Sequence, residues 1–169
     1  MPGGSCLGLG WLMQYDRQLS GGVIMFDRLK QELERHRQRP FLEAAMAACA
    51  LIASADDEVS FSERARMDAV LESLAELRIF DPHEAVNLFN ARLEALQVDR
   101  QAGQGEAFEA IRRGATAEGA PELLVRICVA ISLADGKFVV NERAMLGLIC
   151  AALNLTPAAI DEAQSELAT

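Results

Sequence analysis

The sequence predicts an all-α fold built around two copies of a helix–acidic loop–helix unit. Hydrophobic residues make up 51% of the 169-residue chain and aromatic residues only 5%, a balance typical of helices packed by aliphatic side chains. The second observation is an internal repeat, because residues 55–64 return in similar form, seventy-nine positions later, as residues 134–143. A chain of this length fits one domain with a core of its own.

The repeat extends well beyond the two acidic segments. Both segments begin with Ala-Asp, have an apolar residue three positions after the Asp, and carry Glu-Arg seven and eight positions after it. At the same offset the flanking apolar positions pair as Ala45 with Leu124, Cys49 with Cys128, Ile52 with Ile131, Met67 with Leu146, Val70 with Ile149, Leu71 with Cys150 and Leu74 with Leu153. A match of this length indicates a duplicated unit, in which a nearly all-apolar helix precedes the loop and an amphipathic helix follows it.

The N-terminal region differs from the rest of the chain. Residues 1–24 contain scattered glycines without a sustained period, which predicts a disordered leader or an upstream extension, and residues 25–169 then form a single domain. Residues 25–39 place Phe26, Leu29 and Leu33 on one face among basic side chains and predict a short basic amphipathic helix that Pro40 ends. Such a helix suits peripheral association with the inner membrane, an acidic partner, or the acidic body of its own chain.

Two buried helices and two helix starts follow from the repeat. Buried helices are predicted over residues 41–55 and 123–134, where charges are nearly absent. The segment Ser60-Phe61-Ser62-Glu63 predicts a capping box that starts an amphipathic helix over residues 60–78. In the second copy Val139 takes the position of Ser60 and offers no oxygen, so we expect Glu142 to lack the reciprocal partner that Glu63 has.

The remaining helices are predicted from caps and breakers. Asp81 as N-cap and Pro82 in the first turn predict a helix that runs to about Val98. Gly103 and Gly105 predict a loosened junction before a helix over residues 106–113. Thr156 is the expected cap of a final helix over residues 156–167.

Composition excludes several classes of function. The formal net charge is −9 and the slight positive excess lies before residue 41, so the acidic body argues against nucleic-acid binding. The four cysteines lack zinc spacing, and the three of them on apolar helix faces, Cys49, Cys128 and Cys150, are expected to be core residues in a reducing cytoplasm. No apolar run is long enough for a transmembrane helix. His36 and His83 lie apart, and no nucleophile turn or phosphate loop is present, so the sequence predicts no enzyme.

The two acidic loops are the candidate metal site. Hard divalent cations such as calcium take several oxygen ligands at once, more than either loop offers alone. Together the loops offer six carboxylates, namely Asp56, Asp57, Glu58, Glu63, Asp135 and Glu142. The alternative is structural: each Asp satisfies backbone amides in its turn, Gly136 supplies a left-handed conformation, and each Glu caps the following helix.

The chain resembles the tellurite-resistance protein B (TerB) family of bacteria. The resemblance covers about residues 26–160 and lies in Phe26-Asp27-Arg28-Leu29, the segment from Ala55-Asp56 to Ser60, Leu77-Arg78-Ile79-Phe80-Asp81, and Ala130 to Phe138 with its Ala-Asp-Gly element. It implies a compact bundle of seven to eight helices, a cytoplasmic stress-response module near the inner membrane, and acidic marks at Asp56, Glu63, Asp135 and Glu142. Asp57 stands where the family resemblance leads us to expect glycine, and Val139-Val140-Asn141 is less acidic than the family pattern.

These observations lead to two functional hypotheses. The first is a TerB-like module that responds to tellurite or other chemical stress and binds a divalent cation or a partner protein through its two acidic loops. The second is a helical interaction or scaffold protein that has no metal site. Glu142, which has a weaker structural explanation than Glu63, is the residue expected to be kept for function alone.

Overall fold

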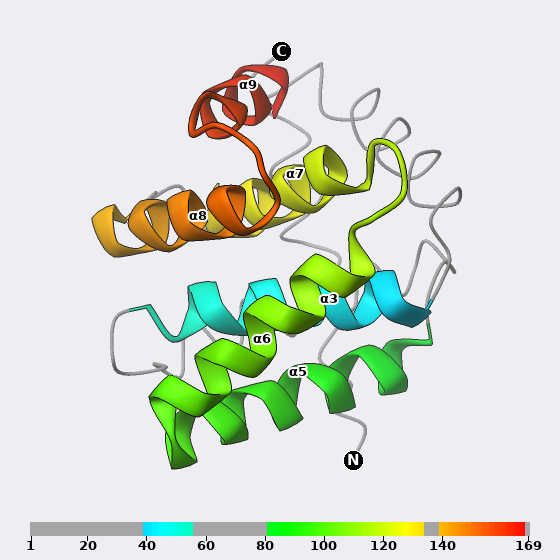
Figure 1. Ribbon diagram of the computed structural model, residues 1–169. Coiled ribbons are helices and arrows are strands. Elements are labelled where there is room, and N and C mark those ends of the chain that lie inside the picture. The colour runs from blue at the N-terminus through cyan, green and yellow to red at the C-terminus, as the bar shows by residue number, and fades with distance from the viewer. Residues whose placement is uncertain (1–38, 56–80, 134–138, 168–169) are drawn as a thin grey trace, which may run out of the picture.

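The computed structural model describes residues 39–55, 81–133 and 139–167, and every element in these ranges is a helix (Figure 1). The helices are α3 (Arg39–Ala53), α5 (Pro82–Val98), α6 (Arg100–Gly114), α7 (Ala120–Leu133), α8 (Val140–Ala152) and α9 (Ala158–Leu167). The all-α prediction is therefore confirmed for this part of the chain. The total of seven to eight helices, the duplication, and the predicted helices over residues 25–39 and 60–78 stay predictions, because they involve residues outside these ranges.

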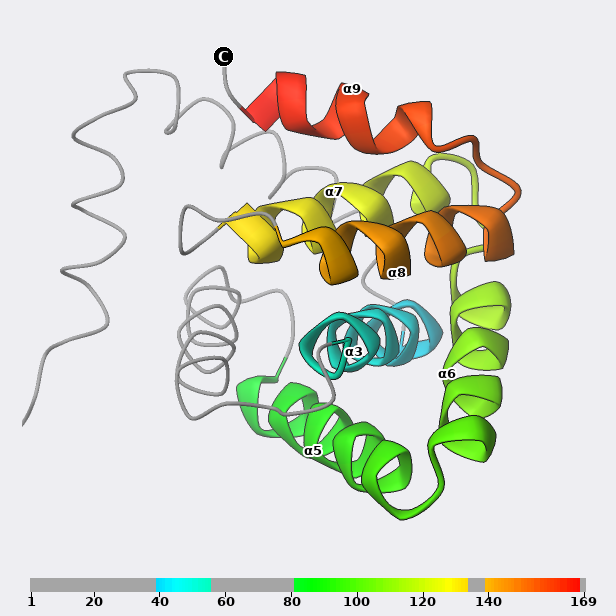
Figure 2. The same ribbon diagram turned by 90° about the vertical axis from the view of Figure 1, so that its left-hand side faces the viewer.

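Helix α3 lies at the centre of the bundle, as Figure 2 shows. It contacts α5 and α6 on one side and α7 and α8 on the other, and α9 packs mainly on α7. From Phe41 to Ala53 every α3 side chain except Glu43 is buried. Six of these buried positions are alanines, namely Ala44, Ala45, Ala47, Ala48, Ala50 and Ala53. A helix with neighbours on both sides needs such small residues, because a larger side chain would push a neighbour away.

The start of α3 corrects one expectation about Pro40. The sequence predicted that Arg39 belongs to a preceding helix that Pro40 ends, whereas the structure has Arg39 and Pro40 in the first turn of α3. Proline is tolerated there because the first amide groups of a helix have no intrahelical acceptor. Arg39 pairs with Glu43 in the next turn of α3 and with Glu84 of α5. The first turn of α3 is thereby tied to α5.

The junction between α5 and α6 is the largest departure from the sequence prediction. Asp81 caps α5 as expected, since its carboxylate accepts from the His83 amide at 2.9 Å. Asp99 then ends α5 and caps α6, accepting from the Ala102 amide at 3.0 Å, so α6 begins at Arg100 rather than near residue 106. The predicted break at Gly103 and Gly105 is wrong, because α6 runs through both glycines.

Two glycines of α6 allow close helix contacts. A Cβ atom at Gly103 would lie 2.9 Å from the carbonyl carbon and oxygen of Ala95 in α5, and one at Gly114 would lie 2.0 Å from the carbonyl oxygen of Pro40 in α3. At Gly105 an added Cβ would meet nothing within 4 Å. The close approach of neighbouring backbones, and not a need for a turn, therefore requires glycine at 103 and 114.

The second half of the chain follows its prediction more closely. Helix α7 follows Gly119, α8 begins after Val139, and α9 begins at Ala158, two residues later than expected. Asn154 has φ 59° just after α8, while the amide of Leu155 donates to the Cys150 carbonyl and the amide of Asn154 to the Ala151 carbonyl. These bonds form a Schellman motif, which ends α8 and turns the chain toward α9.

The core contains three of the four cysteines. Cys49, Cys128 and Cys150 are free and fully buried, as predicted, while Cys6 lies outside the described residues. None of the helices described is both long enough and apolar enough to cross a membrane.

Candidate functional site

The described helices that border the two acidic loops meet at one end of the bundle. Helix α3 and helix α7 run in the same direction, so the end of α3, the end of α7 and the start of α8 lie toward the left-hand side of Figure 1. We call this part of the molecule the loop end and define it by the residues at these helix ends, Ala55 after α3, Leu133 at the end of α7 and Val139 before α8. The chain enters the first acidic loop and both enters and leaves the second one here.

Five of the six predicted ligands lie outside the described residues. These are Asp56, Asp57, Glu58 and Glu63 of the first copy and Asp135 of the second. Only Glu142 is described, so the pooling of carboxylates from the two loops stays a prediction. Among the described residues no group of three or more His, Cys, Asp or Glu side chains is arranged to hold a metal ion. A calcium-like site would therefore need oxygens from the loops themselves.

Glu142 has a structural partner, contrary to the prediction. It is the third residue of α8 and is only 5% exposed. One of its carboxylate oxygens, Oε2, accepts a hydrogen bond at 3.3 Å from the backbone amide of Val139, the N-cap residue. This contact is the glutamate half of a capping box, and the other half is missing because a valine side chain offers no oxygen. The prediction overlooked that the glutamate half needs only a backbone amide, which every N-cap residue except proline provides.

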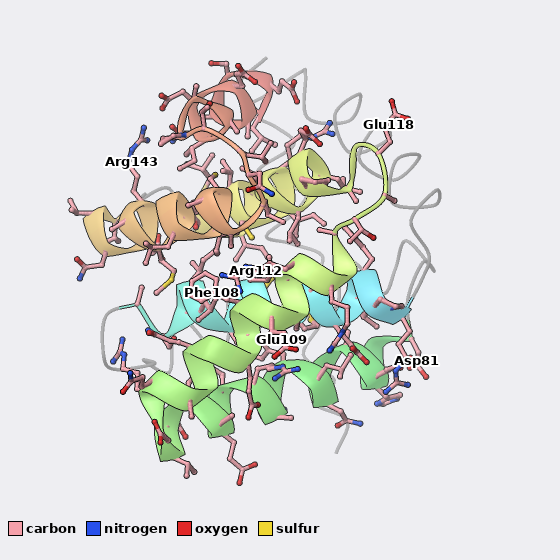
Figure 3. The ribbon with its side chains drawn as sticks, viewed as in Figure 1. Asp81, Phe108, Glu109, Arg112, Glu118 and Arg143 are labelled. Carbon is pink, nitrogen blue, oxygen red and sulfur yellow. The ribbon has the colours of Figure 1, made fainter. Side chains whose placement is uncertain are left out.

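Arg143 points away from the core and joins α8 to α9. Its guanidinium group pairs with Asp161 and donates to the Gln164 side-chain oxygen at 3.1 Å (Figure 3). The two residues of the Glu-Arg pair in the second unit therefore have different roles. Glu142 is buried at the start of α8, and Arg143 connects α8 to α9 on the surface. Both tasks support the fold beside the loop end.

Arg100 lies beside the loop end and was not among the residues predicted from the sequence. Its guanidinium donates to the backbone carbonyl of Ser54 at 2.8 Å, just after the last turn of α3. The last carbonyl groups of a helix lack intrahelical donors and carry partial negative charge, so a cation is favourable there. Asp99, the cap of α6, places Arg100 at the first position of that helix. Only the packing of α6 against α3 brings residues 54 and 100 together.

The buried cysteines have the wrong protonation state for metal binding or nucleophilic attack. Burial raises the pKa of the Cys49 thiol to about 12, and burial together with the nearby Cys49 and Cys150 raises the pKa of Cys128 well above its ordinary value. Burial also raises the pKa of Cys150. The thiolate is the reactive and metal-binding form, so these three thiols behave as small core residues at neutral pH.

Comparison with known proteins gives one family and a named relative. The model of the family described as "Tellurite resistance protein TerB" matches residues 42–165. A protein of Alcaligenes sp named "Tellurium resistance protein TerB" is 31% identical over 101 residues, which cover 60% of this chain and 83% of that protein. No solved structure gives a significant match. The family match spans all six described helices, except for the first residues of α3 and the last ones of α9.

Proposed function

This chain belongs to the TerB family, and we propose that it is a tellurite or chemical stress-response module that binds a divalent cation or a partner protein at its loop end. The observation that carries this proposal is the arrangement of the helix ends that border both acidic loops. The end of α3, the end of α7 and the start of α8 lie at the same end of the bundle, so two loops that are far apart in sequence border the same part of the molecule (Figure 1).

The direction of the helices supports a shared cation site. Helix α3 contacts both α7 and α8 along the bundle. Because the loops leave α3 and α7 in the same direction, short loops are enough to bring their carboxylates within reach of one ion. Carboxylates pooled from the two short loops would then meet the requirement of a hard cation for several oxygen ligands, which neither loop meets alone.

Within this proposal Glu142 is a positioning residue. Its carboxylate caps α8 through the Val139 amide and thereby fixes the point where the second loop joins the helix. Asp135 and the carboxylates of the first loop are then the expected ligands. This assignment replaces the hypothesis that Glu142 is kept for function alone.

A metal titration of the full chain tests the proposal. Calcium and magnesium are added separately to the ¹⁵N-labelled protein after treatment with a chelator, and amide shifts are followed by NMR. We expect saturable shifts at Asp56, Asp135 and Gly136 below millimolar calcium, and their loss in the double variant Asp56→Asn, Asp135→Asn. The matched control is Glu118→Gln, which removes one exposed carboxylate before α7 and should leave binding unchanged. Absence of saturable shifts below millimolar concentration would refute cation binding.

The second candidate function is protein interaction without a metal. The observation that favours it is the capping role of Glu142, because this acidic residue of the second unit stabilises the start of α8. In this case the loop end recognises a partner directly, and the protein binds rather than catalyses. A negative metal titration combined with an intact fold supports this candidate. Peripheral association with a membrane through residues 25–39 stays a prediction, because that segment lies outside the described residues.

A further inference from the structure

An open hollow lies between α6 and α8, away from the loop end. Both helices begin toward the loop end (Figure 1), where Arg100 of α6 contacts Ser54, and the hollow is formed by their later turns. Its lining consists of Phe108, Arg112, Leu148, Ala151, Ala152 and Asn154. Figure 3 shows Phe108 and Arg112 between the two helices. Four of the six residues are apolar, and the other two carry hydrogen-bond donors.

Helix α8 exposes apolar side chains beside this hollow. Leu148 is 56% exposed and Val140 79%, and the exposed residues Val140, Ala144, Leu148 and Ala151 follow one another at three- and four-residue steps on one face. The opposite face buries Met145, Leu146 and Ile149 in the core. From Ala144 to the end of α8 no residue is charged. A surface helix ordinarily places charged or polar residues on its outer face, so this outer face has the composition of a contact surface.

Arg112 has no ion pair or hydrogen bond to any of the residues that the structure describes, unlike the other described arginines. Six of these seven arginines have a partner: Arg39 with Glu43 and Glu84, Arg92 with Glu106, Arg100 with the Ser54 carbonyl, Arg113 with Glu43, Arg126 with Glu166, and Arg143 with Asp161. The chain has 25 acidic residues against 16 basic ones, so carboxylate partners are abundant. Arg112 instead lies exposed beside an apolar surface.

A purely structural role does not account for this arrangement. Both Arg112 and Arg113 lie in the last turn of α6, where a cation stabilises the helix C-terminus. Arg113 supplies that charge and also pairs with Glu43 at 3.6 Å. The helix end therefore needs no second arginine, and its requirements do not explain why Leu148 on the facing helix is exposed.

We propose that the hollow is a docking site for an acidic amphipathic helix of a partner protein. Apolar side chains of that helix would pack on Phe108 and Leu148, while one of its carboxylates would receive the guanidinium of Arg112, a geometry that favours two parallel hydrogen bonds. Ala151 and Ala152 are small enough to let a helix backbone come close. Asn154, which also lines the hollow, would offer an amide donor to the same carboxylate. This surface is separate from the loop end and requires no metal.

The test uses a defined peptide and the full-length chain. The probe is a blocked 14-residue helix with leucine on one face and glutamate beside it, and its control carries glutamine in place of every glutamate. Titration into ¹⁵N-labelled protein is expected to give saturable amide shifts centred on Phe108, Arg112, Leu148 and Ala151. The glutamine peptide should bind about tenfold more weakly, because it forms no charge-assisted bond with the guanidinium.

Three protein variants locate the contact. Arg112→Gln is expected to weaken binding of the acidic peptide about tenfold. Arg113→Gln is the control: it removes the same charge from the neighbouring residue and should leave the affinity for the peptide unchanged. Leu148→Ala should also weaken binding without lowering the melting temperature, because Leu148 is exposed in the free protein. The proposal is overturned by equal binding of both peptides, by equal effects of the two arginine variants, or by shifts that lie elsewhere. If the amide shifts around Leu148 depend on protein concentration without any peptide, the protein self-associates through this surface. That result would assign the surface to a second copy of the chain and would also overturn the proposal.

Discussion

Helices α3 and α7 hold equivalent positions in the predicted repeat, yet their side chains differ in size. Ala45, Ala48 and Ala50 of α3 align with Leu124, Ile127 and Val129 of α7, and all six are buried. Helix α3 has α5 and α6 on one side and α7 and α8 on the other, whereas α7 keeps Arg126 and Ala130 only partly buried. Among the described helices, small residues therefore occupy the helix that has neighbours on more sides, and large aliphatic residues occupy the one that contacts fewer of these helices.

The largest expected effect is a cavity on the α7 side. Leu124→Ala gives α7 the residue that α3 has at this position, and we expect it to lower the free energy of unfolding by about 3–4 kcal/mol, because Leu124 is fully buried and its neighbours cannot close the void. Urea denaturation followed by circular dichroism measures the change. A cost below about 1 kcal/mol would mean that α7 is packed as loosely as a surface helix.

The reciprocal change should also destabilise, for the opposite reason. Ala45→Leu gives α3 the residue of α7, and we expect a loss of about 2–3 kcal/mol, since the added atoms have no room between α3 and its neighbours. The same urea experiment applies. If Ala45→Leu is neutral or stabilising, residue size does not set the helix spacing around α3 and the comparison fails.

The close contact between α5 and α6 tests whether small residues are also needed where a neighbouring backbone comes close. Gly103→Ala places a methyl group 2.9 Å from the backbone of Ala95, and we expect a net cost of about 1–2 kcal/mol after the better helix propensity of alanine is included. Gly105→Ala is the matched control in the same helix, where nothing lies within 4 Å. This control should stabilise the protein by about 0.5–1 kcal/mol. Two variants with the same sign would show that the close approach has no energetic consequence.

The smallest expected effect concerns the start of α8. Helices α5 and α6 are capped by Asp81 and Asp99, whereas α8 has only the Glu142 half of a capping box. Glu142→Ala should cost about 0.5–1 kcal/mol. Glu142→Gln should cost little, because an amide oxygen also accepts from the Val139 amide. A large loss of stability in the glutamine variant would show that the charge of Glu142, and not only its hydrogen bond, holds this end of the molecule.

Features that depend on neighbours in sequence were predictable. The periodicity of apolar residues marked the two buried helices, and Asp81 with Pro82 marked the start of α5, because capping joins groups only two or three residues apart. The Ala-Asp elements and their flanks indicated the TerB family, which the match over residues 42–165 confirms. The pooling of the six candidate carboxylates remains a prediction, since five of them lie outside the described residues.

The sequence by itself determined that this chain is helical, where several of its helices begin, and which family it belongs to, since these follow from local hydrogen bonding and residue pattern. Tertiary structure alone decided that Gly103 is a contact point rather than a helix breaker, and that Glu142 is buried as a cap. It also decided that Arg112 stands beside an apolar hollow while the other described arginines find partners. The physical reason is that close backbone approach, burial and ion pairing depend on which helices meet in space. Local sequence patterns do not show which distant residues come into contact.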